Sequence, residues 1–305
     1  MTKLHRVLAA VDFSEPARAA FDHALALSRM HGAELLAVHA VPTDRPFGWY
    51  ARERIALMGS LRRAAEAAGV AFTASVQQGD PAEVILLHAG ARTPDLIVLG
   101  SNKRSGFDRF RFGSVAETVA REANAPVLVV PATAGRVAAT EAPFKNILVA
   151  VDFGEGSRAA IERALAMANG GSRVTVMHAL RGMPFERSHR YPYHLMEPEY
   201  QRSLARVAWR RMASLVPAEA TASGRIHTRV VTGDTTTEIS RVAAEIGADL
   251  ILVGVTARGV IGRLLRGSTT ARVIRSAGRP VLAVPQPAGE AAATIPARDR
   301  LAAAA

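Results

Sequence analysis

The chain repeats one sequence pattern, and this duplication constrains its fold more than any other feature. The run Val-Leu-Ala-Ala-Val-Asp-Phe at 7–13 returns as Ile-Leu-Val-Ala-Val-Asp-Phe at 147–153. Further on, Asp-Leu-Ile-Val-Leu-Gly at 95–100 returns as Asp-Leu-Ile-Leu-Val-Gly at 249–254. A tandem duplication on this scale predicts two similar structural units, so the 305 residues form two domains rather than one.

The copies divide the chain into a first domain over 1–131, a linker over 132–142 and a second domain over 143–286. The linker shows no apolar periodicity. The tail over 287–305 is rich in Ala, Pro, Gly and charged residues, and we expect it to be disordered. The second copy is longer than the first because of additional residues, mostly around 181–200.

Within each copy, short apolar runs alternate with helical patterns. The run 7–11 is continuously apolar, as expected for a strand that is covered on both faces. Ser14 is placed to cap a helix that Gly32 ends. Five strands separated by four helices predict an α/β fold, with two tandem five-stranded parallel-sheet domains and helices on both faces.

Composition excludes several classes of function. The chain has no cysteine, which rules out disulfides, thiolate metal sites and a cysteine nucleophile. The formal net charge is +11, but only three of the 38 basic residues are lysines and the arginines are spread evenly, so we expect no nucleic-acid partner. No apolar run is long enough for a membrane span and no secretory signal is evident, so a cytoplasmic location is expected.

A glycine loop follows the fourth strand of each copy. In the first copy Gly100 ends the strand and Gly113 with Ser114 opens the next helix, and Gly254 and Gly267 have the same spacing in the second copy. A glycine lets the backbone approach a ligand closely, and the free N–H groups of a helix N-terminus suit a phosphate. The glycines could equally serve only the turn, with the serines as helix caps.

These loops, together with Val-Asp-Phe-Ser at 11–14, Gly-Asp-Pro at 79–81 and Ala-Pro-Val-Leu-Val-Val at 125–130, resemble the universal stress protein family. Nucleotide-binding members of that family carry Gly-x2-Gly-x9-Gly-(Ser/Thr) after the fourth strand. Both copies keep this frame, and the resemblance covers almost the whole chain. It implies an adenine nucleotide α-hydrolase-like fold. One position departs from the motif, because its second glycine is Lys103 in the first copy and Ala257 in the second.

The resemblance implies a site for an adenine nucleotide, with ATP as the first candidate and Mg²⁺ as its companion, at the carboxyl ends of the parallel strands. The residues that it assigns are Asp12, Val41, Gly100, Lys103, Gly113, Ser114 and Val115 in the first copy, and Asp152, Leu180, Gly254, Ala257, Gly267, Ser268 and Thr269 in the second. Lys103 could close its pocket or meet a phosphate as a point charge. The second copy is therefore favoured over the first as the binding site, and the first copy stays open. Each aspartate could instead serve its local turn.

Other motifs do not point to an enzyme. Gly-Glu-Gly-Ser-Arg-Ala at 154–159 resembles a dinucleotide fingerprint, but the first copy has Ser14 and Pro16 at the glycine positions, which favours a plain helix start. The Gly-x4-Gly spacing at 254–259 lacks the Lys-Ser/Thr of a phosphate-binding loop. We expect the equivalent His39 and His178 to be partly buried with one hydrogen bond each rather than to form a metal pair.

Two functions therefore stay open. The first is a regulatory stress-response protein that binds an adenine nucleotide and is at most a slow ATPase, since no catalytic base or metal cluster is evident. The second is a scaffold of the same family that has lost nucleotide binding and acts through protein contacts. In either case the fifth strands, at Val127 and Val281, could pair within the chain, and a homodimer is the other arrangement that the resemblance implies.

Overall fold

The computed structural model describes residues 3–44, 47–101, 114–168, 171–180, 197–222, 224–255 and 269–285. Its strands are β1 (Arg6–Ala10), β2 (Glu34–Val41), β3 (Phe72–Gln78), β4 (Leu96–Ser101), β5 (Val127–Pro131), β6 (Asn146–Ala150), β7 (Arg173–Leu180), β8 (Ile226–Thr232), β9 (Leu250–Val255) and β10 (Val281–Pro285). Its helices are α1 (Glu15–His31), α2 (Phe47–Ala67), α3 (Pro81–Arg92), α4 (Ser114–Glu122), α5 (Glu155–Met167), α6 (Glu197–Leu215), α7 (Ala218–Ala222), α8 (Thr235–Glu245) and α9 (Thr269–Ser276).

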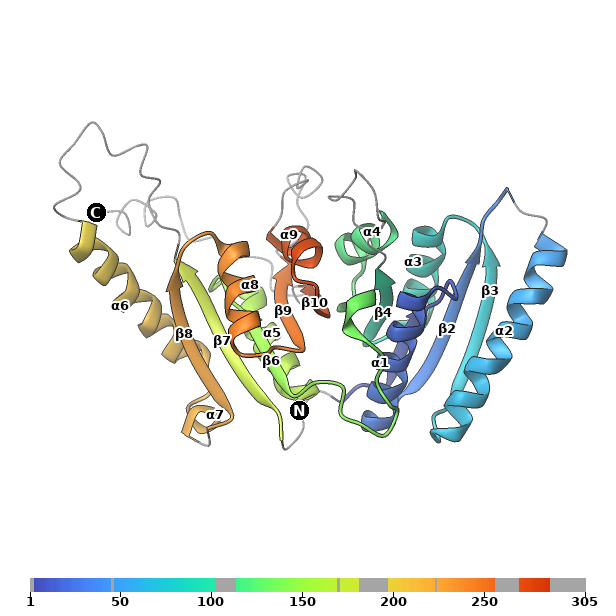
Figure 1. Cartoon of the computed structure of the whole chain (residues 1–305), viewed down its shortest axis with the longest axis horizontal. Helices are drawn as coiled ribbons and strands as arrows, with labels where there is room; N and C mark the ends of the chain where they lie inside the picture. The colour runs from blue at the N-terminus through green and yellow to red at the C-terminus, as the bar shows by residue number, and fades with distance from the viewer. Residues whose placement is uncertain are drawn as a thin grey trace.

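Each copy forms a five-stranded parallel sheet, as the sequence predicts. The first has the strand order β3-β2-β1-β4-β5, and the second has β8-β7-β6-β9-β10. All neighbours within a copy are parallel. The two sheets join through antiparallel pairing of β5 with β10, so that one ten-stranded sheet runs through the molecule (Figure 1). The fold class is confirmed, and the fifth strands do pair within the chain.

Helices cover both faces of this sheet and enclose two apolar cores. One core lies under α1, α2, α5 and α6, and the other lies under α3, α4, α8 and α9. Ala20 of α1 and Ile161 of α5 belong to the first core, and Val119 of α4 and Val273 of α9 belong to the second. Each core contains residues of both copies, so the two units share a continuous interior instead of each having its own separate core.

Helix ends agree with the expected capping. Ser14 accepts from the backbone N–H of Ala17 through its side chain, and Gly32 ends α1 in a left-handed conformation with φ of 64°. The aspartates of the two Gly-Asp pairs cap α3 and α8, because Asp80 accepts from Ala82 N and Asp234 accepts from Thr237 N. Within the described ranges, no helix is long and apolar enough to cross a membrane.

The predicted linker lies against both copies. Its residues Ala132–Ala134 form a short 3-10 helix, η1, in which Thr133 donates to the carbonyl of Gly278 at 2.8 Å. Arg136 forms an ion pair with Asp22 of α1. These contacts, together with the shared cores, fix one copy on the other and place the carboxyl ends of their parallel strands at defined positions.

Candidate functional site

Three predicted residues of the first copy come together at one edge of the sheet. Asp12 follows β1, Val41 ends β2, and Gly100 lies one residue before the end of β4. Because these strands are parallel neighbours in the order β2-β1-β4, their carboxyl ends meet there. The second copy repeats the arrangement, because Leu180 ends β7, Asp152 follows β6 and Gly254 lies near the end of β9.

The helices that follow the glycine loops begin beside this edge. Ser114 is exposed at the first position of α4, and Val115 is half-buried after it. Thr269 is half-buried at the first position of α9. The other predicted loop residues lie outside the described part of the chain and stay predictions: Lys103, Gly113, Ala257, Gly267 and Ser268.

Both aspartates serve their local turn, which was one of the two interpretations. Asp12 accepts through Oδ1 from the backbone N–H of Ser14 at 2.9 Å and from the Ser14 hydroxyl. Asp152 accepts through Oδ1 from Gly154 N at 2.8 Å and from the Ser157 hydroxyl at 3.0 Å. Both residues are exposed, and their Oδ2 atoms accept no hydrogen bond from the residues that the structure describes. The turn therefore fixes one carboxylate oxygen, and the other has no donor among the described residues.

The residue after each aspartate has an unusual backbone. Phe13 has φ of 64° and Phe153 has φ of 62°, and both lie in the left-handed region. A bulky side chain in this region costs on the order of 1–3 kcal/mol and persists only where its surroundings enforce it. Strain of this kind at the same point of both copies is typical of functional sites. Sequence reasoning missed it, although the identical Asp-Phe pair in both copies marks the position.

One histidine of each copy lies next to this turn and forms a hydrogen bond to a backbone carbonyl, as predicted. His39 Nδ1 is 2.7 Å from the carbonyl oxygen of Val11, and His178 Nδ1 is 2.8 Å from that of Val151. Burial lowers the pKa of His39, so the imidazole is neutral near pH 7 and Nδ1 carries the donated proton. No group of three or more metal-ligating side chains occurs among the residues with described positions.

The glycine at the end of β4 is needed for helix packing. A Cβ atom on Gly100 would lie 2.5 Å from the carbonyl carbon of Pro16 and 2.6 Å from the nitrogen of Ala17, so the start of α1 occupies that space. Gly254 is different, because its nearest neighbour in that direction is the carbonyl carbon of Gly156 at 3.5 Å. Gly156 thus lies against Gly254 at a helix–strand contact, which agrees with a plain helix start rather than a dinucleotide fingerprint.

The ends of β2 and β7 are held by glycines of the Gly-Asp pairs. The carbonyl of Val41 accepts from Gly79 N at 3.0 Å, and that of Leu180 accepts from Gly233 N at 2.9 Å. The two glycines have φ of 154° and 155°, a conformation that side chains rarely adopt. The carbonyls that the resemblance places beside an adenine are therefore already bonded within the chain.

The second copy has an additional charge pair near this edge. Arg272 of α9 donates to both carboxylate oxygens of Asp234 at 3.2 Å. The pKa of Asp234 is lowered, chiefly by the hydrogen bond from the backbone N–H of Thr237 and further by Arg272. The first copy has Thr118 at the position of Arg272, so the two candidate sites differ in charge.

One buried hydroxyl near the site has no hydrogen-bond partner within the described ranges. Ser101, the last residue of β4, is 2% exposed, and its Oγ makes no hydrogen bond among the residues that the structure describes. The second copy has Val255 at this position. An unpaired buried hydroxyl is unfavourable unless a ligand or another group satisfies it.

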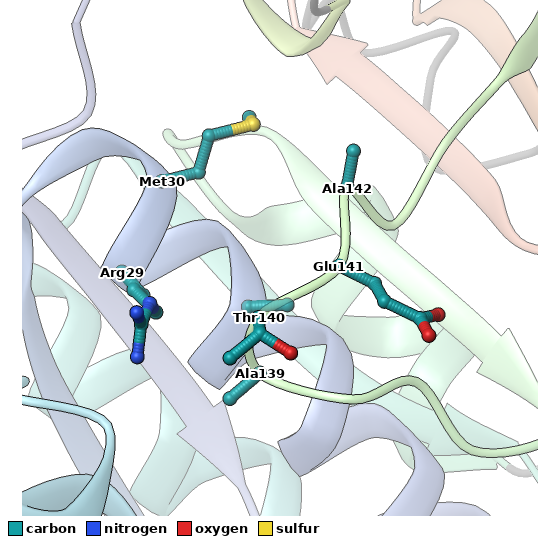
Figure 2. A pocket seen from close by; sticks show the side chains of 7 residues that line it. Arg29, Met30, Ala139, Thr140, Glu141 and Ala142 are labelled. Atoms are coloured by element: carbon teal, nitrogen blue, oxygen red, sulfur yellow. The ribbon is translucent and has the colours of Figure 1, made fainter.

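A hollow of about 310 Å³ lies elsewhere, between α1 and the linker. Figure 2 shows Arg29 and Met30 of α1 across from residues 139–142 of the linker. These residues stand near the C-terminal end of α1, whereas the candidate site adjoins its N-terminal end. The hollow therefore belongs to the junction of the linker with the first copy and not to the site.

Comparisons with known proteins agree with the duplication. The sequence model of the universal stress protein family matches residues 3–131 and 143–285. A universal stress protein of Methanocaldococcus jannaschii is 30% identical over 137 residues, which cover 41% of this chain and 81% of that protein. A universal stress protein of Thermus aquaticus is 37% identical over 135 residues, 41% of this chain and 96% of that protein.

Among solved structures, a universal stress protein from Archaeoglobus fulgidus has the same fold over its full length. It superimposes with a TM-score of 0.69 at 19% sequence identity and covers 93% of this chain and 97% of that one. At this level of identity the likeness concerns the fold. The likeness extends across both copies, because the superposition covers 93% of this chain.

Proposed function

This chain belongs to the universal stress protein family, and from that premise we propose that it binds an adenine nucleotide, ATP first among them, as a regulatory stress-response protein of the cytoplasm. The observation that carries the proposal is the repeated position of Asp12 and Asp152. Each lies at the carboxyl end of the central strand of its copy, and each has one carboxylate oxygen fixed by the turn and the other without a donor among the described residues.

The chemistry of this edge suits a nucleotide. The carboxylate oxygen that the turn leaves without a donor can accept from a ribose hydroxyl or an exocyclic amine. The exposed start of α4 presents N–H groups that have no partner within the helix and a positive dipole end, both of which suit a phosphate. We propose that the loops of 102–113 and 256–268 complete the phosphate site, with Ser114, Val115 and Thr269 at their helix ends. Mg²⁺ would then arrive with the phosphates.

The second copy is the proposed principal site. Ala257 replaces the motif glycine with one methyl group, whereas Lys103 replaces it with a long charged side chain. Neither sequence motifs nor the described side chains supply a general base beside the proposed phosphate position, so turnover would be slow or absent.

The replacement of the motif glycine in both copies favours one alternative, a scaffold that works through protein contacts without a nucleotide. Calorimetric titration of the full chain with ATP and Mg²⁺ distinguishes the two functions. We expect Asp152→Asn to weaken binding, because the amide keeps the Oδ1 bonds to the turn but loses the negative charge. Asp22→Asn, on the face of α1 toward the linker, is the matched control.

A further pair of titrations locates the site. We expect Ala257→Arg to abolish the stronger binding event while the fold is retained. Equal affinity in Ala257→Arg and wild type would place the nucleotide elsewhere than the second loop. Absence of heat in the wild type, together with absence of bound ATP by dialysis, would favour the scaffold.

A further inference from the structure

In each copy one histidine contacts both neighbours of the candidate aspartate. His39 binds the carbonyl oxygen of Val11 at 2.7 Å, and its ring centroid lies 5.2 Å from that of Phe13. Asp12 stands between these two residues in the chain. The second copy has the same set, with His178 bonded to Val151 at 2.8 Å and its ring 4.2 Å from Phe153, on either side of Asp152.

Where the backbone hydrogen bonds between the first two strands of each copy end, the histidine side chain makes the next hydrogen bond. The backbone N–H of Val11 still bonds to the carbonyl of Val38 on β2 at 2.9 Å, but its own carbonyl bonds to the His39 side chain. In the second copy Val151 N bonds to Met177 O at 2.9 Å, and its carbonyl turns to His178. A side chain of the neighbouring strand thus fixes the peptide that leads into the aspartate.

The left-handed phenylalanine is held from a second side as well. The guanidinium of Arg54 lies over the Phe13 ring at 5.5 Å, and that of Arg211 lies over the Phe153 ring at 5.8 Å. A cation over an aromatic face is attracted by the ring quadrupole. Each strained residue therefore lies between an imidazole and a guanidinium.

The two arginines come from different positions of their helices. The buried Met58 of α2 and Met212 of α6 are equivalent in the repeat, and Arg54 precedes the first by four residues whereas Arg211 precedes the second by one. Arginines from helix positions about one turn apart thus contact the equivalent phenylalanine ring in each copy. What the two copies share is a phenylalanine held between an imidazole and a guanidinium, and not an arginine at one equivalent position.

We propose that His39 and His178 are positioning residues of the nucleotide site. Each holds the peptide before its aspartate by a hydrogen bond and the residue after it by ring contact, and so orients the free carboxylate oxygen toward the ligand. The inference rests on the proposed function, because it concerns the same carboxylates. It adds the residues that determine how tightly these carboxylates can bind.

Three variants of His178 separate the two contacts. His178→Asn keeps an N–H donor close to the Nδ1 position and loses the ring, His178→Phe keeps a ring and loses the donor, and His178→Leu loses both. We expect ATP affinity in calorimetry to fall less than threefold for Asn and about tenfold for Phe and Leu, in line with loss of one buried hydrogen bond. His227→Leu, on the exposed side of β8, is the matched control and binds as wild type does.

Circular dichroism and thermal unfolding show which variants are folded, and if His178→Leu is not, the comparison of Asn with Phe decides. Wild-type affinity in both His178→Asn and His178→Phe would overturn the inference and leave the proposed function intact. Absence of ATP binding by the wild type would overturn the proposed function, and the positioning role would fall with it. We expect His178→Asn to keep close to the wild-type affinity for ATP and His178→Phe to bind ATP more weakly.

Discussion

Leu128 of β5 lies opposite Leu282 of β10, and these two residues occupy the same position in the two sequence repeats. Their neighbours pair crosswise, Val127 with Ala283 and Val129 with Val281. A pseudo-twofold axis therefore passes between the two leucines, as it would in a dimer of identical subunits. Because the duplication places both copies in one chain, the edge strands β5 and β10 pair with each other and neither is left as an open edge of its sheet.

This seam is expected to hold the two copies together. Leu128 is fully buried, so Leu128→Ala should leave a cavity and lower the free energy of unfolding by about 2–5 kcal/mol. Urea denaturation measures the change. Leu87→Ala, on a side chain that is 59% exposed, is the matched control and should change stability by less than about 0.5 kcal/mol. Equal effects of both substitutions would argue against a closely packed seam.

The two strand-end glycines are predicted to differ in their tolerance of a methyl group. Gly100→Ala would force the backbone of Pro16 and Ala17 to shift and should destabilise the fold by about 1–3 kcal/mol. Gly254→Ala meets only ordinary contacts and should change stability by less than about 0.5 kcal/mol. Thermal unfolding of the two variants provides the comparison, and an equal loss in both would contradict the difference in helix packing.

The buried hydroxyl of Ser101 has no partner in the part of the chain that the structure describes, and this predicts a stabilising substitution. Removal of the hydroxyl in Ser101→Ala should raise the free energy of unfolding by about 1 kcal/mol in the absence of ligand. A melting temperature below that of the wild type would show that the hydroxyl is satisfied. If ATP raises the melting temperature of the wild type more than that of the variant, the hydroxyl contacts the bound nucleotide.

Burial lowers the pKa of His23, and a backbone hydrogen bond to Ala19 together with the charges of Asp22 and Asp249 only partly offsets this. The folded state therefore binds fewer protons at this site than the unfolded state. Stability from this group is present above the unfolded pKa of about 6.5 and is lost as the pH falls toward the folded pKa. Denaturation curves between pH 7 and 5 should show a smaller acid loss in His23→Gln than in wild type.

The direction of the pKa shift can be checked independently of stability. His31, His39 and His88 also have lowered pKa values because of burial, so the wild type should lose stability below pH 6.5 faster than one histidine explains. An NMR titration of the ring protons should place the pKa of His23 below the ordinary histidine value of about 6.5. A pKa of His23 above the ordinary value would contradict the burial argument.

Much of the fold followed from local sequence. The Val-Asp-Phe repeats marked the central strands, Ser14 and Gly32 marked the ends of α1, and the alternation of elements predicted the parallel sheets, because capping and apolar periodicity act over a few residues. Pairing of the two fifth strands within the chain was one of two arrangements that the family resemblance left open, and the structure shows it. The sequence did not predict their register, which depends on which side chains meet across the seam.

The candidate site was less predictable. The positions of Asp12 and Asp152 followed from the motif, but the left-handed conformation of Phe13 and its clamp by His39 arise from strands that are distant in sequence. Gly100 was interpreted as room for a ligand, whereas its Cβ direction faces the start of α1. Local patterns identify residue types at a site, but tertiary contacts decide which atoms they face.

Native mass spectrometry of the intact chain with ATP tests nucleotide binding directly. We predict at least one ATP per chain at micromolar to low millimolar nucleotide, with reduced occupancy in Asp152→Asn and unchanged occupancy in Asp22→Asn. CTP at the same concentration should give lower occupancy if the site recognises adenine. A chain that stays free of ATP under these conditions, while folded by circular dichroism, would contradict the nucleotide-binding function.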